Sequence, residues 1–272
     1  MFTRKPPAKP RPVTADDRGK IFATVRDHSD VLALAAPDHP GFTEASADAN
    51  AGIHMSTMAV KSCPVHMMKA RAVMPCASRD FLEYLELDAR ARWDDHYIRG
   101  HVHEQIDAQT QLKYMSFKAP LPILRNRDFE IAVCERWDDA TQTAVLKAVS
   151  PPEGMICPAD PAGTTVRGSI LLSGFIVKPV QDLTSLPKAI AGAKEACEVT
   201  YIALVHPRGR LPPAFVNLVI GKQTSTLRVL QRFIRENPKI HEKRGRRHPG
   251  TAGPARPLDG TSKGSHQLKA KL

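Results

Sequence analysis

Hydrophobic and polar residues alternate with a period of two through most of the middle of the chain. Such alternation is typical of antiparallel strands that turn one face to a core and the other to water. It predicts nine strands, at residues 53–60, 65–74, 101–107, 111–118, 128–136, 143–149, 165–173, 174–179 and 199–205. We therefore expect a largely antiparallel sheet built from this part of the chain.

Helical spacing of apolar residues occurs on either side of the strands and at points between them. It predicts helices at residues 20–36, after Ser78, at 89–97, at 185–197 and, as the longest such pattern, at 212–235. Pro213 suits the first turn of the last helix, and an apolar stripe follows it. A sheet with one apolar face needs a cover, and this final helix is the obvious candidate. The predicted fold class is therefore α+β.

Composition and charge narrow the class of protein. The 272 residues are 42% hydrophobic, which is enough for one domain with a sizeable core. The formal net charge is +11, but residues 1–20 carry +4, residues 235–272 carry +7, and the region between them is neutral. A nucleic-acid-binding fold is expected to carry a positive face on its folded part. We therefore predict no specific nucleic-acid partner.

The two ends of the chain differ from its middle in composition. Residues 1–19 are rich in proline, which predicts an extended, disordered basic arm. Residues 237–272 are rich in Gly, Pro and basic residues, and we expect a disordered basic tail there. A single domain at 20–236 lies between them. The tail sequence KRGRR at 243–247 is typical of a nuclear-import signal or of a patch that contacts anionic membranes, and an inert solvated tail is the alternative.

Membrane spans and disulfides are not predicted. The longest nearly uncharged apolar run, residues 170–177, is far shorter than the roughly 20 residues that a transmembrane helix needs. The first residues lack the apolar segment of a secretory signal. Five cysteines occur without a CxxC spacing, at positions 63, 76, 134, 157 and 197. Reduced thiols in a cytoplasmic protein are the simplest interpretation.

Candidate metal ligands and catalytic residues are few. His101 and His103 share one strand face, yet no third ligand follows at a fixed spacing, so we expect a solvated surface. Asp128, next to Arg127, is expected to form a structural ion pair. The chain has no GxSxG motif, and Cys134 has no evident histidine partner. We predict no catalytic residue, no metal site and no cofactor.

Several short motifs follow one another in a characteristic order. They are Trp93-Asp94-Asp95, a hairpin of the form V-x-E-x-I-D-x-x-T-x-x-x-Y within 101–118, Arg127-Asp128-Phe129, Val166-Arg167, Val199-Thr200-Tyr201, the HPRGRLP segment at 206–212, and Phe215-Val216-Asn217. In order and spacing, residues 20–236 resemble a START domain, the lipid-transfer family related to the steroidogenic acute regulatory protein. The resemblance implies a helix-grip fold, in which a curved antiparallel sheet wraps around a long C-terminal helix. It also implies a tunnel that holds one lipid, and no catalysis.

The resemblance also suggests which residues contact the lipid. The tunnel-lining candidates are Tyr114, Val133, Arg167, Phe215, Leu218 and Val219. Arg167 could meet a polar head through its fork of donors, or it could form an outward salt bridge. Sterol-binding members place a buried acid–base pair on neighbouring strands, and the corresponding positions here, near Tyr114 and Val133, lack it. The expected gate is the loop at 150–164, with Met155 and Ile156, together with the start of the final helix near Pro212.

These expectations describe an intracellular protein that binds or transfers a lipid. Enclosing a roughly 16-carbon chain avoids a cost of about 13 kcal/mol for exposing that chain to water. The expected partners are a phospholipid, sterol or fatty-acyl lipid, and anionic membrane surfaces that the basic tail contacts transiently. Two alternatives stay open: a cyclase- or hydrolase-type enzyme on the same scaffold, and an adaptor that acts through its basic tails.

Overall fold

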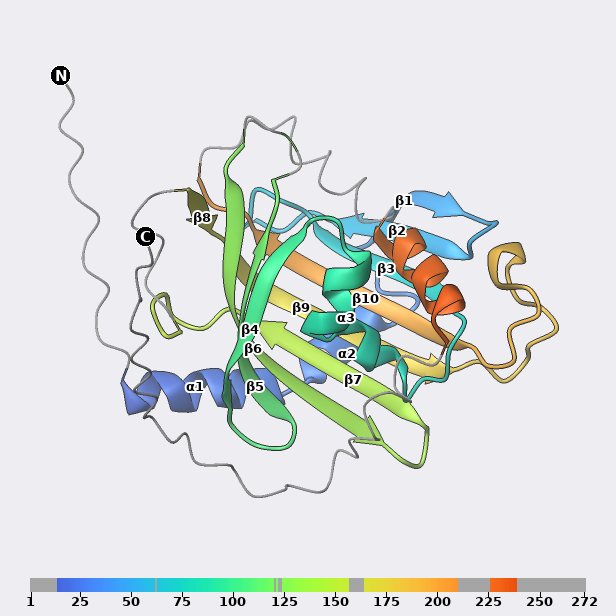
Figure 1. The fold of residues 1–272 in the computed structure, drawn as a ribbon, viewed down its shortest axis with the longest axis horizontal. Helices are drawn as coiled ribbons and strands as arrows, with labels where there is room; N and C mark the ends of the chain where they lie inside the picture. The colour runs from blue at the N-terminus through green and yellow to red at the C-terminus, as the bar shows by residue number, and fades with distance from the viewer. Residues whose placement is uncertain are drawn as a thin grey trace, which may run out of the picture.

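The computed structural model describes residues 14–61, 63–119, 121, 124–156, 164–209 and 226–238. Within them one large, curved sheet organises the molecule (Figure 1). Its strands lie in the order β1-β2-β3-β10-β9-β7-β6-β5-β4, and neighbours in this order run antiparallel, while the short β8 pairs with β6 in parallel. The strands are β1 Thr43–Asp48, β2 Ile53–Met58, β3 Met67–Met74, β4 Tyr97–Gln105, β5 Thr110–Phe117, β6 Asn126–Asp138, β7 Thr143–Val149, β8 Thr165–Arg167, β9 Ser169–Pro179 and β10 Cys197–His206.

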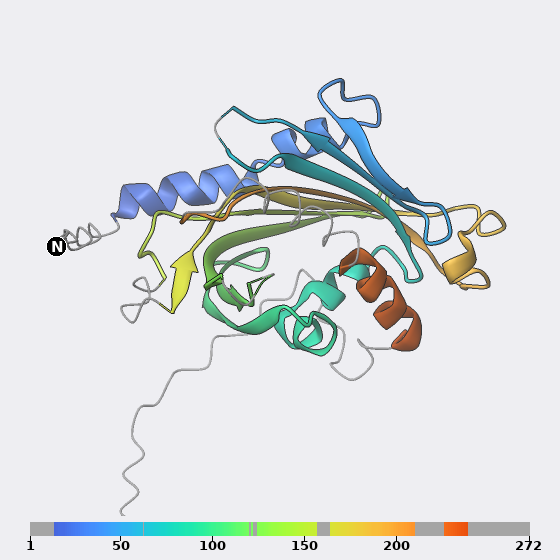
Figure 2. The same cartoon turned by 90° about the horizontal axis from the view of Figure 1, so that it is seen from above.

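Helices cover both faces of this sheet (Figure 2). On one side, which we call the outer face, lie α1 (Ala15–Arg26) and α2 (Ser29–Ala35). On the other side, the inner face, lie α3 (Leu87–Trp93) and the terminal helix, described from 226 to 236. Two short 3-10 helices, η1 (Phe81–Leu85) and η2 (Lys188–Ile190), complete the described elements. The α+β helix-grip class predicted from the sequence is confirmed.

Each face of the sheet has its own apolar cluster. On the outer face, Val25 and Val31 of α1 and α2 pack with Leu112 and Ala132 of the sheet. On the inner face, Phe81, Tyr84, Trp93, Leu230 and Ile234 pack with the opposite side chains of the same strands. The period-two alternation thus separates two cores rather than a core and a wet face.

The described part of the terminal helix is anchored to the inner side of the molecule by hydrogen bonds. The Gln231 side-chain amide donates to the carbonyl oxygens of Ala51 (2.8 Å) and Val73 (2.7 Å). The hydroxyl of Tyr84 donates to the carbonyl of Asn237 at 2.9 Å. These bonds fix the end of the helix against β3, η1 and the turn that precedes β2. Residues 212–225 of the predicted helix lie outside the described part of the chain.

The prediction of one helix over 20–36 is wrong, because two helices occupy this region. The chain turns between Arg26 and Ser29, where the Asp27 carboxylate accepts a hydrogen bond from the Ser29 amide at 3.0 Å. The turn buries His28, whose Nε2 lies 3.2 Å from the carbonyl oxygen of Cys134. At the other end, Thr14 and an acidic residue in the first turn form a capping box, so α1 begins before position 20. Residues 15–19 of the predicted arm therefore belong to α1, and residues 1–13 lie outside the described part.

Strand β1 was not predicted, because its sequence TEASAD is polar and almost wholly exposed. The predicted break between residues 173 and 174 is also wrong, since β8 and β9 separate at Gly168. A Cβ atom at Gly168 would stand 2.3 Å from the ring of Phe129, so only glycine fits this close approach. The predicted helix at 185–197 is reduced to η2.

Membrane spans can be judged for the described helices. None of them is both long and apolar enough to cross a bilayer.

Candidate functional site

A cavity of about 360 Å³ lies between the inner face of the sheet and the elements that cover it. Its position follows from a row of small side chains that crosses four neighbouring strands. Ala203 of β10 pairs with Ser173 of β9, and Ser173 pairs with Ala148 of β7. Val133 of β6 continues the row beside Ala148. All four line the cavity, and their small volume leaves the sheet and its cover apart.

The walls around this row are mainly apolar. They are formed by residues of β3, β5, β6, β7, β9 and β10, and the larger of them are Met68, Met115, Phe117, Phe129, Ile131, Leu146, Ile170, Phe175, Tyr201 and Val205. The rings of Phe175 and Tyr201 stack at 4.3 Å between centroids, which makes one wall flat and rigid. A cavity with this lining suits the hydrocarbon part of a ligand.

Charged side chains reach the cavity from α3, from the residues directly before and after it, and from β5. The ammonium of Lys113 lies 3.3 Å from the carboxylate of Glu86, and the Lys113 side chain is only 7% exposed. Arg90 and Asp94 form a second pair at 3.2 Å. The Nε atom of Arg90 is buried and has no hydrogen-bond partner among the described residues. The cavity is thus apolar along the sheet and polar beneath α3.

Glu135 of β6 is the fifth charged group at this end. It lines the cavity, and no hydrogen bond or ion pair to its carboxylate occurs within the described part of the chain. Burial raises the pKa of Glu135 to about 7; Lys113 opposes this shift and Glu86 adds to it. A carboxyl group with this pKa is half protonated at neutral pH and can either donate or accept a hydrogen bond.

The predicted lining residues that the structure describes do not all lie on the same face of the sheet. Val133 lies in the cavity wall. Tyr114 and Arg167 lie on the outer face, so their assignment to the tunnel is corrected. Adjacent residues of a strand point to opposite faces, and on β5 it is Lys113 and Met115 that face inward. The remaining candidates, Phe215, Leu218, Val219 and the gate residue Pro212, lie outside the described residues.

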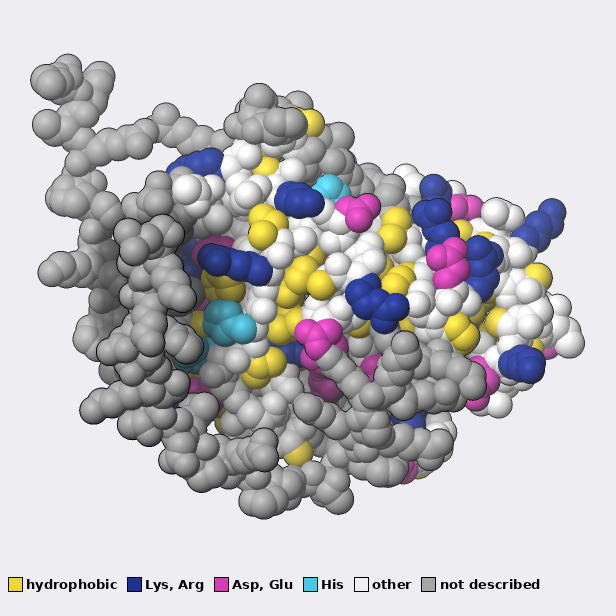
Figure 3. Space-filling model, viewed as in Figure 1, with side chains coloured by type: hydrophobic (Ala, Val, Ile, Leu, Met, Phe, Trp, Pro, Cys, Tyr) yellow, Lys and Arg dark blue, Asp and Glu magenta, His cyan; other side chains and the backbone are white. Residues whose placement is uncertain are grey.

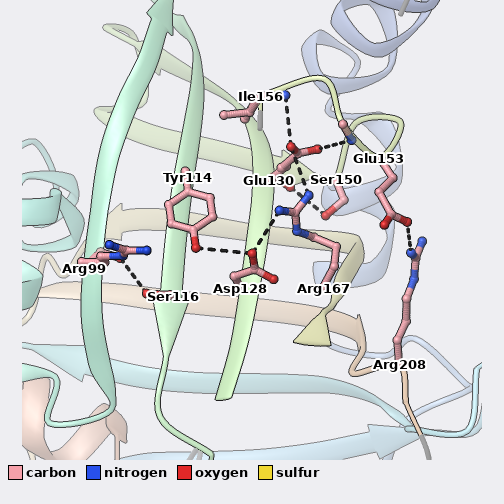
Figure 4. Close-up of polar contacts among 11 residues, drawn as sticks. Arg99, Tyr114, Ser116, Asp128, Glu130, Ser150, Glu153, Ile156, Arg167 and Arg208 are labelled. Atoms are coloured by element: carbon pink, nitrogen blue, oxygen red, sulfur yellow. Dashed lines mark hydrogen bonds and ion pairs between the residues drawn. The ribbon is translucent and has the colours of Figure 1, made fainter. Parts of the chain in front are cut away.

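On the outer face Arg167 is the centre of a buried polar network (Figure 4). Its guanidinium lies 3.0 Å from the Asp128 carboxylate and 3.1 Å from that of Glu130. The Tyr114 hydroxyl donates to Asp128 at 3.3 Å. The sequence left two roles open for Arg167, contact with a lipid head or an outward salt bridge. The structure shows a salt bridge on the outer face, and the Arg167 side chain in it is buried. Asp128 thus pairs with Arg167 and not with its neighbour Arg127, whose guanidinium is directed to the carbonyl oxygens of Pro207 and Arg208.

The predicted gate residues Met155 and Ile156 also belong to the outer face. Both pack in the apolar cluster beneath α1 and α2, and Met155 is buried. The backbone amides of Gly154 and Ile156 donate to the Glu130 carboxylate at 3.1 Å each. This part of the loop is therefore fixed on the side of the sheet opposite the cavity.

The sequence reading also missed the charged end of the cavity. It compared Tyr114 and Val133 with the sterol-type acid–base pair, but the inward position on β5 is Lys113, one residue earlier. Glu135 lies two residues after Val133 on the same strand, so both side chains point to the same face. This spacing could have identified Glu135 as a cavity residue from the sequence.

The described residues contain no group of three or more His, Cys, Asp or Glu side chains arranged to hold a metal ion. The rings of His101 and His103 lie 6.4 Å apart, and His101 stacks on Tyr114 at 5.4 Å. Burial raises the pKa of the Cys134 thiol, which does not favour a nucleophilic thiolate.

Comparisons with known structures agree on the fold. Human StAR-related lipid transfer protein 5 superimposes with a TM-score of 0.68 at 14% identity, over 83% of this chain and 100% of that one. Human STARD10 gives 0.61 at 18% identity, over 86% and 84%. A STAR-related lipid transfer protein of Xanthomonas axonopodis gives 0.56 at 20% identity, over 72% and 99%.

Sequence comparisons assign the family. A search of curated proteins found no match. The family model described as the START domain matches residues 29–233, which is most of the chain and includes every strand of the sheet. This protein therefore belongs to the START domain family, a lipid-binding and lipid-transfer family.

Proposed function

We propose that this protein encloses one lipid in the inner-face cavity and carries it between membranes, without catalysis. The observation that supports this most directly is the row Val133, Ala148, Ser173 and Ala203, which keeps an apolar space open in the centre of the domain. A cavity of this kind lowers the cost of moving a hydrocarbon chain through water, because the chain stays covered during transfer.

The size of the cavity favours a single-chain lipid or a compact ring system over a two-chain phospholipid. An apolar cavity of about 150 Å³ accommodates benzene, with six carbons. By the same proportion, about 360 Å³ suits roughly 14 carbons. Keeping a chain of that length out of water is worth about 11 kcal/mol. This is enough to explain why such a lipid would need a carrier.

The outer surface supports the same function. On the side that carries α3, apolar side chains are scattered among charged ones rather than gathered in one broad area (Figure 3). Exposed or half-exposed basic residues surround the cavity end formed by strand connections, namely Lys118, Arg125, Arg127 and Arg208. We infer that this end meets anionic membranes, since each basic residue near such a surface contributes about 1 kcal/mol.

The test compares the same substitution at two places. Val133→Trp fills the cavity, whereas Val102→Trp adds the same bulk to the exposed strand β4. We expect the purified wild type and Val102→Trp to retain about one lipid per chain, detected by extraction and mass spectrometry. Val133→Trp should retain at most about a tenth as much, with an unchanged circular dichroism spectrum, and should fail to move lipid between vesicles. Equal lipid content in both variants, or none in the wild type, would overturn the proposal.

A further inference from the structure

Near α3, four of the described charged side chains that line the cavity form two ion pairs, and Glu135 lies close to one of these pairs. Glu86 neutralises Lys113, and Asp94 neutralises Arg90, each at salt-bridge distance. Glu135 faces the same space and has no such partner within the described residues. When the Glu135 carboxyl is ionised, this part of the cavity therefore carries one negative charge without a positive partner.

Among the described basic residues of the cavity wall, Arg127 does not supply this positive charge. Arg127 also lies on β6, but eight residues of extended strand separate it from Glu135, roughly 26 Å along the chain. The Arg127 side chain is also directed to carbonyl oxygens of Pro207 and Arg208. Lys113 approaches Glu135 closely enough to lower its pKa, but its ion pair is with Glu86.

We propose that the Glu135 carboxylate makes this cavity select a long-chain primary amine over an uncharged lipid of the same length. The ammonium head would lie against Glu135 beneath α3, and the hydrocarbon chain would follow β6 past Val133 toward Arg127. An ammonium carries three donors and one positive charge, which matches the missing charge of this site. The inference rests on the proposed lipid-binding function and names its ligand class.

Binding of the amine is coupled to release of a proton. In the empty cavity burial keeps the Glu135 carboxyl largely protonated below pH 7. The bound ammonium keeps its own proton and favours the carboxylate, so the carboxyl proton passes to the buffer. The groups facing Glu135 are Lys113 of β5 and Glu86 before α3, which form a salt bridge with each other. Amine affinity should therefore weaken about tenfold per pH unit below 7 and level off above it.

The experiment titrates tetradecylamine and 1-tetradecanol, below their aggregation limits, into the full chain in a calorimeter at pH 6 and pH 8. The wild type should bind the amine at least about tenfold more tightly than the alcohol at pH 8 and lose most of this preference at pH 6. Repeating the pH 6 titration in two buffers of different ionisation enthalpy should show release of about one proton per amine. This measurement needs no variant.

Two variants of equal charge sharpen the result. Glu135→Gln should bind amine and alcohol equally and without pH dependence. Glu44→Gln, which removes an exposed carboxylate on β1, should behave as the wild type. Alcohol binding without amine preference in the wild type would overturn this inference and leave the proposed function standing. Binding of neither probe, together with absence of copurified lipid, would overturn both.

Discussion

Glu130 and Glu135 lie five positions apart on β6 and point to opposite faces of the sheet. Glu130 is 2% exposed, pairs with Arg167 at 3.1 Å and accepts two backbone amides. Glu135 is half-buried and lines the cavity, and its carboxylate has no hydrogen-bond or ion-pair partner among the described residues. A buried charge with several partners specifies a structure, whereas an unpaired charge in a cavity wall is available to a ligand.

The packing of the two faces differs in the same way. On the outer face, side chains of α1 and α2 reach the sheet, and Val31 occupies the space that Gly174 leaves. On the inner face, Ala148 and Ala203 leave a space that the described side chains of α3 and the terminal helix do not fill. The outer face thus contributes stability, and the inner face contributes a binding site at some cost in stability. Three substitutions test this division.

The largest effect is expected on the outer face. Replacing Arg167 by Met keeps much of the side-chain volume but leaves Asp128 and Glu130 buried without their cation. We expect the free energy of unfolding to fall by about 3–5 kcal/mol, measured by urea denaturation. Arg208→Met is the control, because Arg208 pairs with Glu153 on the exposed surface. That change should cost at most about 1 kcal/mol. Similar losses in both variants would contradict the comparison.

The second substitution, Glu135→Gln, should raise the free energy of unfolding rather than lower it. Burial raises the pKa of Glu135 from an ordinary value of 4.5 to about 7, so the folded protein holds a proton that the unfolded chain releases. Between these two pH values the folded state binds more protons, and its stability falls as the pH rises. The loss is complete above pH 7 and amounts to at most about 3 kcal/mol. Glutamine does not titrate and avoids this loss.

We therefore expect Glu135→Gln to match the wild type near pH 5 and to exceed its stability by about 1–3 kcal/mol at pH 8. Urea denaturation at four pH values between 5 and 8 measures the difference. Glu44→Gln, on the exposed strand β1, should follow the wild type at every pH. A Glu135→Gln variant that is less stable at pH 8 would mean that the carboxylate has a structural partner, as Glu130 does.

The sequence predicted the sheet well, because strand alternation is a local property. It did not predict β1, whose residues have no apolar face and whose pairing with β2 is decided by the rest of the sheet. It also joined α1 and α2, because the turn at Asp27 depends on burial of His28 against a strand that lies 106 residues later. Features set by long-range contacts were thus the ones that local patterns missed.

The site was harder to predict than the fold, and the reason is again the period of two. Tyr114 and Lys113 are neighbours in sequence but lie on opposite faces of the sheet. A shift of one residue in the comparison with the family therefore assigns an outer-face residue to the cavity. Val133, the other position considered, faces the cavity. The charged end needed three elements at once: the residue before α3, β5 and β6. No local sequence pattern indicates that these three elements lie close together in the fold.

Tyr114→Phe is expected to have the smallest effect on stability, and it gives the most direct comparison of the two faces of the sheet. The lost hydroxyl donates to Asp128 at 3.3 Å, and Asp128 keeps its ion pair with Arg167. We expect a loss of about 1 kcal/mol in the free energy of unfolding and no change in copurified lipid. Tyr201→Phe is the matched substitution on the inner face, since Tyr201 lines the cavity and stacks on Phe175. A change in lipid content with Tyr201→Phe alone supports the division, whereas a change with Tyr114→Phe would place the ligand on the wrong side of the sheet.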